Sequence, residues 1–463
     1  MEGMKSRVGG NASKRVALVI AATASFITTF MGSSINIALP AIGEEFALDA
    51  VSLGWVSTSY LLAAAIFLVP FGRIADIYGR KRVLKYGVII YTVASFLSAV
   101  SASAVALISF RVLQGIGGAM VYCTGIAILT SVFPPGERGK ALGISVAATY
   151  TGLSLGPSVG GLLTQHLGWR SIFFVNVPLG LAVIAAVLWK LKGEWAESRG
   201  EKFDISGCII YSLALVALMY GLSLLPAVSR VWLIVIGISG IVAFVRWEMR
   251  LENPVLNVSL FRDNIVFAFS NLTALIHYSA TFAVAFFLSL YLQCIKGFSP
   301  GYAGLVLISQ PVVMAILSPV AGKLSDKIEP RLVASTGMAL TAAGLGMLAF
   351  LNEETMLEFI IAGLIVIGFG AALFSSPNTN AVMSSVDKKF YGIASATLAT
   401  VRQIGQMFSM GIAMVLLAIH MGRVQITPEC YQLFLGSMKI AFIIFAVLCF
   451  GGVFTSLARG KIR

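Results

Sequence analysis

Charge is scarce in this chain of 463 residues. Only 11% of the residues are Asp, Glu, Lys or Arg, whereas about a quarter are charged in an ordinary soluble domain. Hydrophobic residues make up 58%, and they gather in runs of roughly 18–25, enough for a helix to cross a hydrocarbon core about 30 Å thick. The loops between runs are too short, at roughly 20 residues or fewer, for a separate soluble domain. The composition indicates one all-α polytopic membrane body.

Cysteines and catalytic motifs are also few. The five cysteines are scattered and show no C-x-x-C or metal-ligand spacing, which argues against a disulfide framework and a zinc site. The sequence lacks H-E-x-x-H, a Walker loop and G-x-S-x-G, so it has no equipment for metalloprotease, ATPase or esterase chemistry. We therefore expect neither an enzyme nor a bound cofactor or metal.

The apolar runs predict fourteen transmembrane helices. Boundaries read from a sequence carry an error of about 2–4 residues. The N-terminal tail is basic, but the first run is too long for a signal peptide and is read as a retained span. The predicted spans are 16–38, 53–71, 83–101, 104–130, 141–164, 170–189, 204–224, 230–247, 264–293, 300–321, 331–350, 356–380, 391–419 and 437–457.

The positive charge is distributed unevenly about these spans. The net charge is +13, and 26 of the 33 Lys and Arg residues fall on one predicted side, against five on the other. Because basic residues mark the cytoplasmic side, both termini are expected in the cytoplasm of a cell-membrane protein. Membrane topology thus accounts for the excess of positive charge, and we expect no nucleic-acid partner.

Two similar turns indicate a repeated architecture. The stretch "GRIADIYGRKR" follows the second predicted span, and "GKLSDKIEPR" follows the tenth. The second copy occupies the matching place if two extra spans separate two six-span halves, which gives a 6 + 2 + 6 plan. Paired halves with a site between them are common in transporters. The predicted segments are a tail (1–15), an N-terminal bundle (16–189), a linker with two spans (190–263), a C-terminal bundle (264–457) and a tail (458–463).

We interpret the two turns as a gating motif. The basic residues can pair with Asp76 and with carbonyls at neighbouring helix ends, holding those ends together in one state and releasing them in another. The alternative is an ordinary positive-inside loop. The candidate gating residues are Gly72, Arg73, Asp76, Gly79, Arg80, Arg82, Gly322 and Asp326.

Polar stripes within the spans predict a substrate and coupling pathway. A central arginine such as Arg111 costs about 2.5–3.5 kcal/mol on insertion scales, so it should face water or a partner. The alternative is snorkelling to the interface, although Arg111 lies about 10 Å deep at 1.5 Å per residue. Single polar residues are otherwise ordinary links between helices. The candidate pathway residues are Asn36, Arg111, Gln114, Tyr122, Asn271, His277, Tyr278, Gln310, Asn378, Arg402 and Gln406.

The fifth predicted span carries glycines every four residues beside a proline. Such a surface can pack closely and still bend, although an ordinary interface of small residues is an equal alternative. The residues concerned are Gly152, Gly156, Pro157, Gly160 and Gly161.

Four motifs together carry a family resemblance over nearly the whole chain. "GRIADIYGRKR" resembles the loop 2–3 signature of the major facilitator superfamily, with Ile77 where a basic residue is usual, and "LISFRVLQGIGGA" resembles its span 4 signature. "GLSLGPSVGGLL" resembles the span 5 signature associated with antiporters, and "GWRSIFFVNVPLG" is similar to the span 6 entry of the fourteen-span drug/proton antiporters. The resemblance implies alternating access by two rocking bundles, with Arg111 lining the pathway.

One departure from that branch concerns proton coupling. Met31 stands where an acidic residue is usual, and no carboxylate lies at mid-depth in the predicted spans. His277 is the remaining titratable candidate, although a lone histidine in a span more often serves packing. Two arginines and no acid favour an anionic, zwitterionic or neutral small-molecule substrate. We expect a monomer in the lipid bilayer that exports this substrate, with protons as the coupling ion; the alternative is an importer or uniporter of a small anionic or neutral metabolite.

Overall fold

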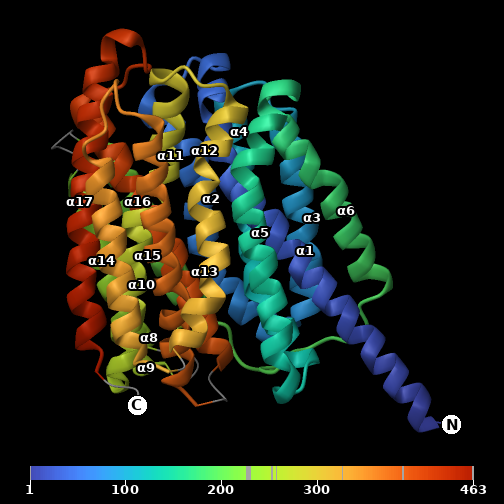
Figure 1. Ribbon diagram of the computed structural model, residues 1–463. Helices are drawn as coiled ribbons and strands as arrows, with labels where there is room; N and C mark the ends of the chain where they lie inside the picture. The colour runs from blue at the N-terminus through green and yellow to red at the C-terminus, as the bar shows by residue number, and fades with distance from the viewer. Residues whose placement is uncertain are drawn as a thin grey trace.

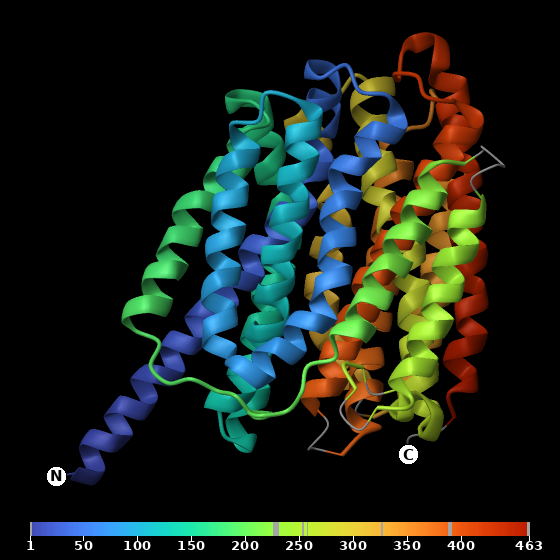
Figure 2. The same cartoon turned by 180° about the vertical axis from the view of Figure 1, so that it is seen from behind.

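The computed structural model describes residues 2–225, 231–251, 254–256, 258–325, 327–387 and 391–460. Within these ranges the regular elements are helices, and most run side by side in one bundle (Figure 1). Both chain ends lie at the same end of the bundle (Figures 1 and 2), which we call the terminal end, and the opposite end is the distal end.

The helices fall into three groups along the chain. The first group is α1 (Glu2–Glu45), α2 (Ala50–Tyr78), α3 (Arg80–Ala99), α4 (Ala104–Val132), α5 (Pro135–Leu167) and α6 (Ser171–Trp189). The second is α7 (Ile205–Ser223), α8 (Val231–Glu248) and the short α9 (Ser259–Asp263). The third is α10 (Ile265–Thr281), α11 (Ala283–Leu290), the π-helix η2 (Tyr291–Ile295), α12 (Pro300–Leu307), α13 (Ser309–Ser325), α14 (Pro330–Leu348), α15 (Leu357–Ser384), α16 (Tyr391–His420), the 3₁₀-helix η4 (Pro428–Cys430) and α17 (Tyr431–Ala458).

The first and third groups pack mainly within themselves. Helix α1 packs on α5, and α4 packs on both α2 and α3; in the third group α14 packs on α15 and α17, and α10 on α16. We call these groups the N-terminal half and the C-terminal half. Helices α7 and α8 pack together, and α7 also contacts α2 and α16, so it lies along the line where the halves meet.

Local sequence signals explain where several helices begin. The Asp49 carboxylate accepts hydrogen bonds from the first turn of α2, and Ser103 and Asn264 do the same for α4 and α10. Such side chains satisfy backbone N–H groups that have no partner within the helix. Pro300 and Pro330 occupy first-turn positions, where the missing N–H costs nothing.

Two long apolar segments are interrupted. Helix α12 ends at Leu307, four residues before Pro311, as expected when a proline cannot donate to the preceding turn. The break between α10 and α11 at Phe282 has no proline; there the Ala283 N–H donates to the Ser409 hydroxyl of α16 at 3.0 Å instead. A hydrogen bond donated to a neighbouring helix thus replaces a hydrogen bond within the helix.

Among the described residues, thirteen helices are long and apolar enough to cross a membrane when these interrupted segments are counted once. Helix α5, the fifth predicted span, is not among them, although it has 33 residues and packs between α1 and α12. The membrane body is confirmed, and fourteen spans stay a prediction. The largest boundary differences are in α1, which extends past the predicted span at both ends, and α2, which ends seven residues late.

Candidate functional site

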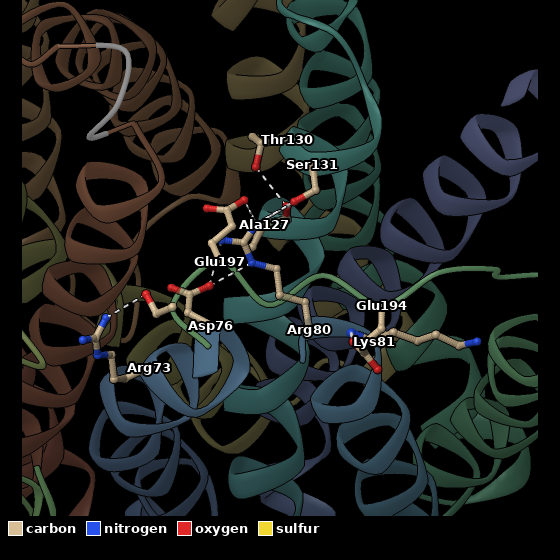
Figure 3. A network of polar contacts seen from close by, with 10 residues as sticks. Arg73, Asp76, Arg80, Lys81, Ala127, Thr130, Ser131, Glu194 and Glu197 are labelled. Atoms are coloured by element: carbon tan, nitrogen blue, oxygen red, sulfur yellow. Dashed lines mark hydrogen bonds and ion pairs between the residues drawn. The ribbon is translucent and has the colours of Figure 1, made fainter. Parts of the chain in front are cut away.

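Arg80 is the centre of a polar cluster at the terminal end (Figure 3). Its guanidinium donates to the Asp76 carboxylate one turn away at 2.7–2.8 Å, and to the Glu197 carboxylate of the linker at 2.8 Å. It also donates to the Ser131 hydroxyl of α4 at 2.5 Å. Only 6% of Arg80 is exposed, so these partners compensate a nearly buried charge.

The linker after α6 is fastened along the same end, and Figure 2 shows it crossing beneath the N-terminal half. The Glu194 carboxylate accepts the backbone N–H of Lys81 at 2.8 Å. Arg73 donates to the Ser198 hydroxyl at 3.2 Å and pairs with the Glu201 carboxylate. Three linker acids therefore bind three residues of the basic turn, Arg73, Arg80 and Lys81, which makes the linker part of this polar cluster.

The predicted gating residues are brought together only in part. Asp76 pairs with Arg80 as expected, whereas Arg73 pairs with the linker and Arg82 is exposed. Gly79 has φ = 119°, a conformation that side chains disfavour, and a Cβ there would meet Glu194. In the second copy Gly322 is half-buried. Asp326 lies outside the described residues.

Arg111 lies inside the N-terminal half. Its Nε donates to the Val56 carbonyl at 3.0 Å, its NH1 donates to the Gln114 side chain at 2.5 Å, and its guanidinium stacks over the Tyr60 ring at 4.5 Å. Gln114 in turn donates to the Ser95 hydroxyl at 2.8 Å. Arg111 is 1% exposed, so in this conformation it ties α4 to α2 and α3, and it meets protein rather than lipid.

Three predicted pathway residues of the C-terminal half are also enclosed. His277 is 2% exposed and stacks on Phe374 with ring centroids 4.2 Å apart, and its Nδ1 has no hydrogen-bond partner. Asn271 donates to its own helix. Asn378 accepts a hydrogen bond from Arg459 at 3.0 Å. These side chains contact residues of the C-terminal half, and Asn36 of α1 is likewise buried.

A second set of predicted pathway residues keeps partial exposure. The Arg402 guanidinium lies over the Tyr278 ring at 4.9 Å, and its Nε has no hydrogen-bond partner. It also interacts electrostatically with Tyr150 and Tyr122 of the N-terminal half. Residues of both halves therefore surround this cation. The half-buried members are Tyr122, Tyr278, Gln310, Arg402 and Gln406.

The glycine face of α5 packs against both halves. Cβ atoms at Gly152, Gly156 and Gly160 would collide with Thr29, Ser33 and Ser34 of α1, and a Cβ at Gly161 would collide with the Pro300 carbonyl of α12. The hydroxyls of Ser33 and Ser34 donate to α5 carbonyls. This polar stripe of α1 therefore links two helices, and Pro157 lies inside α5 without interrupting it.

The two halves meet through hydrogen bonds near the distal end. The Ser289 hydroxyl of α11 donates to the Asn36 carbonyl of α1 at 2.6 Å. The Gly301 N–H of α12 donates to the Gln165 side chain of α5 at 3.1 Å, and the Ala50 N–H of α2 donates to the Val424 carbonyl after α16 at 3.1 Å.

An ion pair at the same end stays within one half. Arg170 binds the Glu45 carboxylate through both terminal nitrogens at 2.6 Å, and this hydrogen bonding raises the pKa of Arg170. The Trp169 indole donates to the same carboxylate at 2.7 Å. Because all three residues belong to the N-terminal half, this pair does not join the halves.

Sequence reasoning missed the linker acids and the distal contacts. The acids Glu194, Glu197 and Glu201 recur every three or four residues, a spacing that matches the basic turn and could have signalled the pairing. Ser289 and Gln293 are likewise four residues apart on one helical face. Tyr60 and Tyr150 gave no comparable signal.

Comparison with known proteins identifies relatives along most of the chain. It is 30% identical over 403 residues to the riboflavin transporter RibZ of Clostridioides difficile, covering 86% of this chain and 87% of that protein. It is 31% identical over 404 residues to the multidrug resistance protein Stp of Mycobacterium tuberculosis, covering 85% and 74%. The tetracenomycin C resistance and export protein of Streptomyces glaucescens is 30% identical over 395 residues, covering 84% and 73%.

Solved structures share the fold. A peptide transporter POT in complex with sulfate matches with a TM-score of 0.68 at 15% identity, covering 94% of both chains. A bacterial homologue of the lysosomal transporter Spinster matches with a TM-score of 0.65 at 16% identity, covering 96% of both. The Major Facilitator Superfamily model matches residues 21–270 and 270–460. This multi-pass membrane protein therefore belongs to the Major Facilitator Superfamily of transporters.

Proposed function

We propose that the chain is a secondary active transporter that exports a small organic compound by alternating access. The observation that carries the proposal is the placement of Arg402, a half-buried cation with an unpartnered Nε between residues of both halves. Such a group at the contact of two bundles suits a substrate site that is reached from one end at a time. Relatives named as a multidrug resistance protein and an antibiotic export protein support export rather than import.

The arrangement fits a state closed at the distal end. Hydrogen bonds from Ser289, Gly301 and Ala50 cross between the halves there. With both termini in the cytoplasm, as the positive charge of the terminal end favours, this is an inward-facing state of a 6 + 2 + 6 membrane body. The cluster around Arg80 then forms the N-terminal side of the cytoplasmic gate, and α7 and α8 are the extra pair.

We propose an anionic, zwitterionic or neutral substrate. Arg402 offers a guanidinium to a carboxylate or a carbonyl, and the nearby Tyr278, Tyr150 and Tyr122 suit a planar ring. The resemblance to a riboflavin transporter favours a neutral planar compound and keeps open the second candidate, an importer or uniporter of a small metabolite.

Proton antiport needs a group that titrates along the pathway, and His277 is our candidate. Its unpartnered Nδ1 can accept a proton once water reaches it, whereas its present contact with Phe374 excludes water. Coupling would then accompany the opening of the C-terminal half.

Flux in proteoliposomes tests the proposed function. Purified protein is reconstituted, and uptake of riboflavin, an anionic dye and the organic cation ethidium is measured with and without a pH gradient. We expect saturable flux of the neutral or anionic probe that a pH gradient accelerates and that His277→Gln makes independent of pH. Flux indifferent to the gradient in the wild type would contradict proton coupling, and faster transport of ethidium would contradict the substrate class.

A further inference from the structure

Pro40 leaves one backbone carbonyl of α1 without its usual donor. In an α-helix the carbonyl of one residue accepts the N–H of the residue four positions later, and proline has no N–H. Pro40 lies inside α1, so the Asn36 carbonyl lacks that partner. Asn36 is 3% exposed, which keeps water away from this carbonyl. A buried carbonyl without a donor is destabilising, and the protein must supply one from elsewhere.

The donor comes from the other half of the molecule. The Ser289 hydroxyl donates to the Asn36 carbonyl at 2.6 Å, and Ser289 is fully buried. The Gln293 amide donates to the neighbouring Ile37 carbonyl at 3.0 Å and to the Ser289 oxygen at 3.0 Å. Ser289 of the C-terminal half thus replaces the hydrogen bond that Pro40 removes from the N-terminal half, and Gln293 adds a second contact at the next carbonyl.

The local structure holds these two donors in place. Ser289 belongs to α11 and Gln293 to the π-helical turn η2, and their spacing of four residues puts both on the side that faces α1. Single π-helical turns are frequent at functional positions of helices. The Tyr291 hydroxyl fastens the same turn by donating to the Asn352 carbonyl at 2.6 Å.

We propose that Pro40, Ser289 and Gln293 form a latch that closes the distal end of the transporter. The proposal rests on the alternating-access function proposed above. When the halves separate at the distal end, the Asn36 carbonyl loses Ser289 and water takes its place. Entry of water and opening of the distal end therefore occur together. Because of Pro40, the Asn36 carbonyl has its hydrogen bond in the closed state only while Ser289 of the C-terminal half lies against it.

Distances between spin labels test the latch. Cysteines at the exposed positions Glu44 in α1 and Glu354 between α14 and α15 carry the labels, in a background without the five native cysteines. In lipid nanodiscs, Ser289→Ala should raise the ratio of long to short distances by about tenfold, because a buried unsatisfied carbonyl penalises only the closed state. Gln293→Met should shift the ratio in the same direction and serves as a second variant if Ser289→Ala does not fold.

A double-mutant cycle with Pro40 separates the latch from general packing. Pro40→Ala restores an N–H to the Asn36 carbonyl within α1, so adding Ser289→Ala to it should change the ratio less than twofold. The matched control is Ser437→Ala, another fully buried serine, whose hydroxyl bonds only within the C-terminal half. We expect wild-type distances for this control.

The outcomes distinguish the latch from the proposed function. Unchanged distances in both Ser289→Ala and Gln293→Met, or an undiminished tenfold effect on the Pro40→Ala background, would overturn the latch even if wild-type vesicles transport. Absence of flux in wild-type vesicles, with the predicted distance changes present, would overturn the proposed function and leave the latch standing as a structural switch.

Discussion

The two ends of the molecule are held by different kinds of contact. At the distal end, hydrogen bonds from Ser289 and Gly301 cross from one half to the other, and several involve backbone groups. At the terminal end, the charged cluster around Arg80 joins the N-terminal half to its own linker. Ion pairs thus join the N-terminal half to its linker, whereas neutral hydrogen bonds join the two halves.

This difference bears on how a transporter can open at only one end. In the proposed alternating-access cycle, contacts between the halves break and form again, so they should be individually modest and replaceable by water. Contacts within a half can be strong, because they move with it as one body. The partly buried Arg80 network fits the second class and the neutral hydrogen bonds of the distal end fit the first.

Replacing Arg80 should have the largest effect, a loss of both stability and flux. Arg80→Ala leaves Asp76 and Glu197 without their shared cation and should lower stability by on the order of 3 kcal/mol, because Arg80 is buried. Flux should fall below one tenth of the wild-type rate. Thermal unfolding and proteoliposome flux measure both effects, with Lys85→Ala as a control that removes a charge from the same helix. Wild-type flux in Arg80→Ala would contradict the gating role.

A bulky residue at Gly304 should destabilise the closed distal end. A Cβ there would collide with the Pro157 carbonyl of α5, so Gly304→Val should prevent α12 from approaching α5. We expect a loss of about 1–3 kcal/mol in the closed state and a longer distance between labels at the distal end. Gly346→Ala is the matched control, because its Cβ meets open space. An unchanged label distance would show that this contact does not close the distal end.

Removing one linker acid should lower stability less than removing Arg80 and should affect the terminal end alone. Glu197→Gln loses an ion pair whose carboxylate is 66% exposed, so the cost should be below about 1 kcal/mol and should vanish at high salt. The linker should become more sensitive to protease while the distal label distance stays at its wild-type value. A change at the distal end instead would mean that the linker couples the two ends.

The ion pair between Glu45 and Arg170 should have the smallest effect. It lies at the distal end but belongs to the N-terminal half alone, and both side chains are about one third exposed or more. Glu45→Gln should therefore lower stability by less than about 1 kcal/mol and leave flux unchanged. Thermal unfolding with flux in parallel checks this, and a strong loss of flux would show that the distinction between the two kinds of contact is wrong.

The sequence predicted the features that depend on local pattern. Long apolar runs predicted most of the helices that can cross a membrane, and the pairing of Asp76 with Arg80, one helical turn apart, followed from their spacing.

Features that depend on distant partners were not predictable in the same way. Arg73 could choose between Asp76 and Glu201, which is 128 residues away, and only the path of the linker decides. The break at Phe282 depends on Ser409 of another helix. The hydroxyls of Thr29 and Ser33 in α1 bond to α5 carbonyls, because the α5 glycines bring its backbone close, and the sequence of α1 alone does not identify this partner.

The most direct test of the account is a cross-link between the halves at the distal end. Gln165→Cys with Gly301→Cys, joined by a short cleavable bifunctional thiol reagent in a background without native cysteines, ties α5 to α12. Lys296→Cys with Glu353→Cys is the control, because both lie at the same end within the C-terminal half. We predict that the first cross-link stops flux until it is cleaved and that the control leaves flux intact. Wild-type flux with the halves tied together would contradict opening at the distal end.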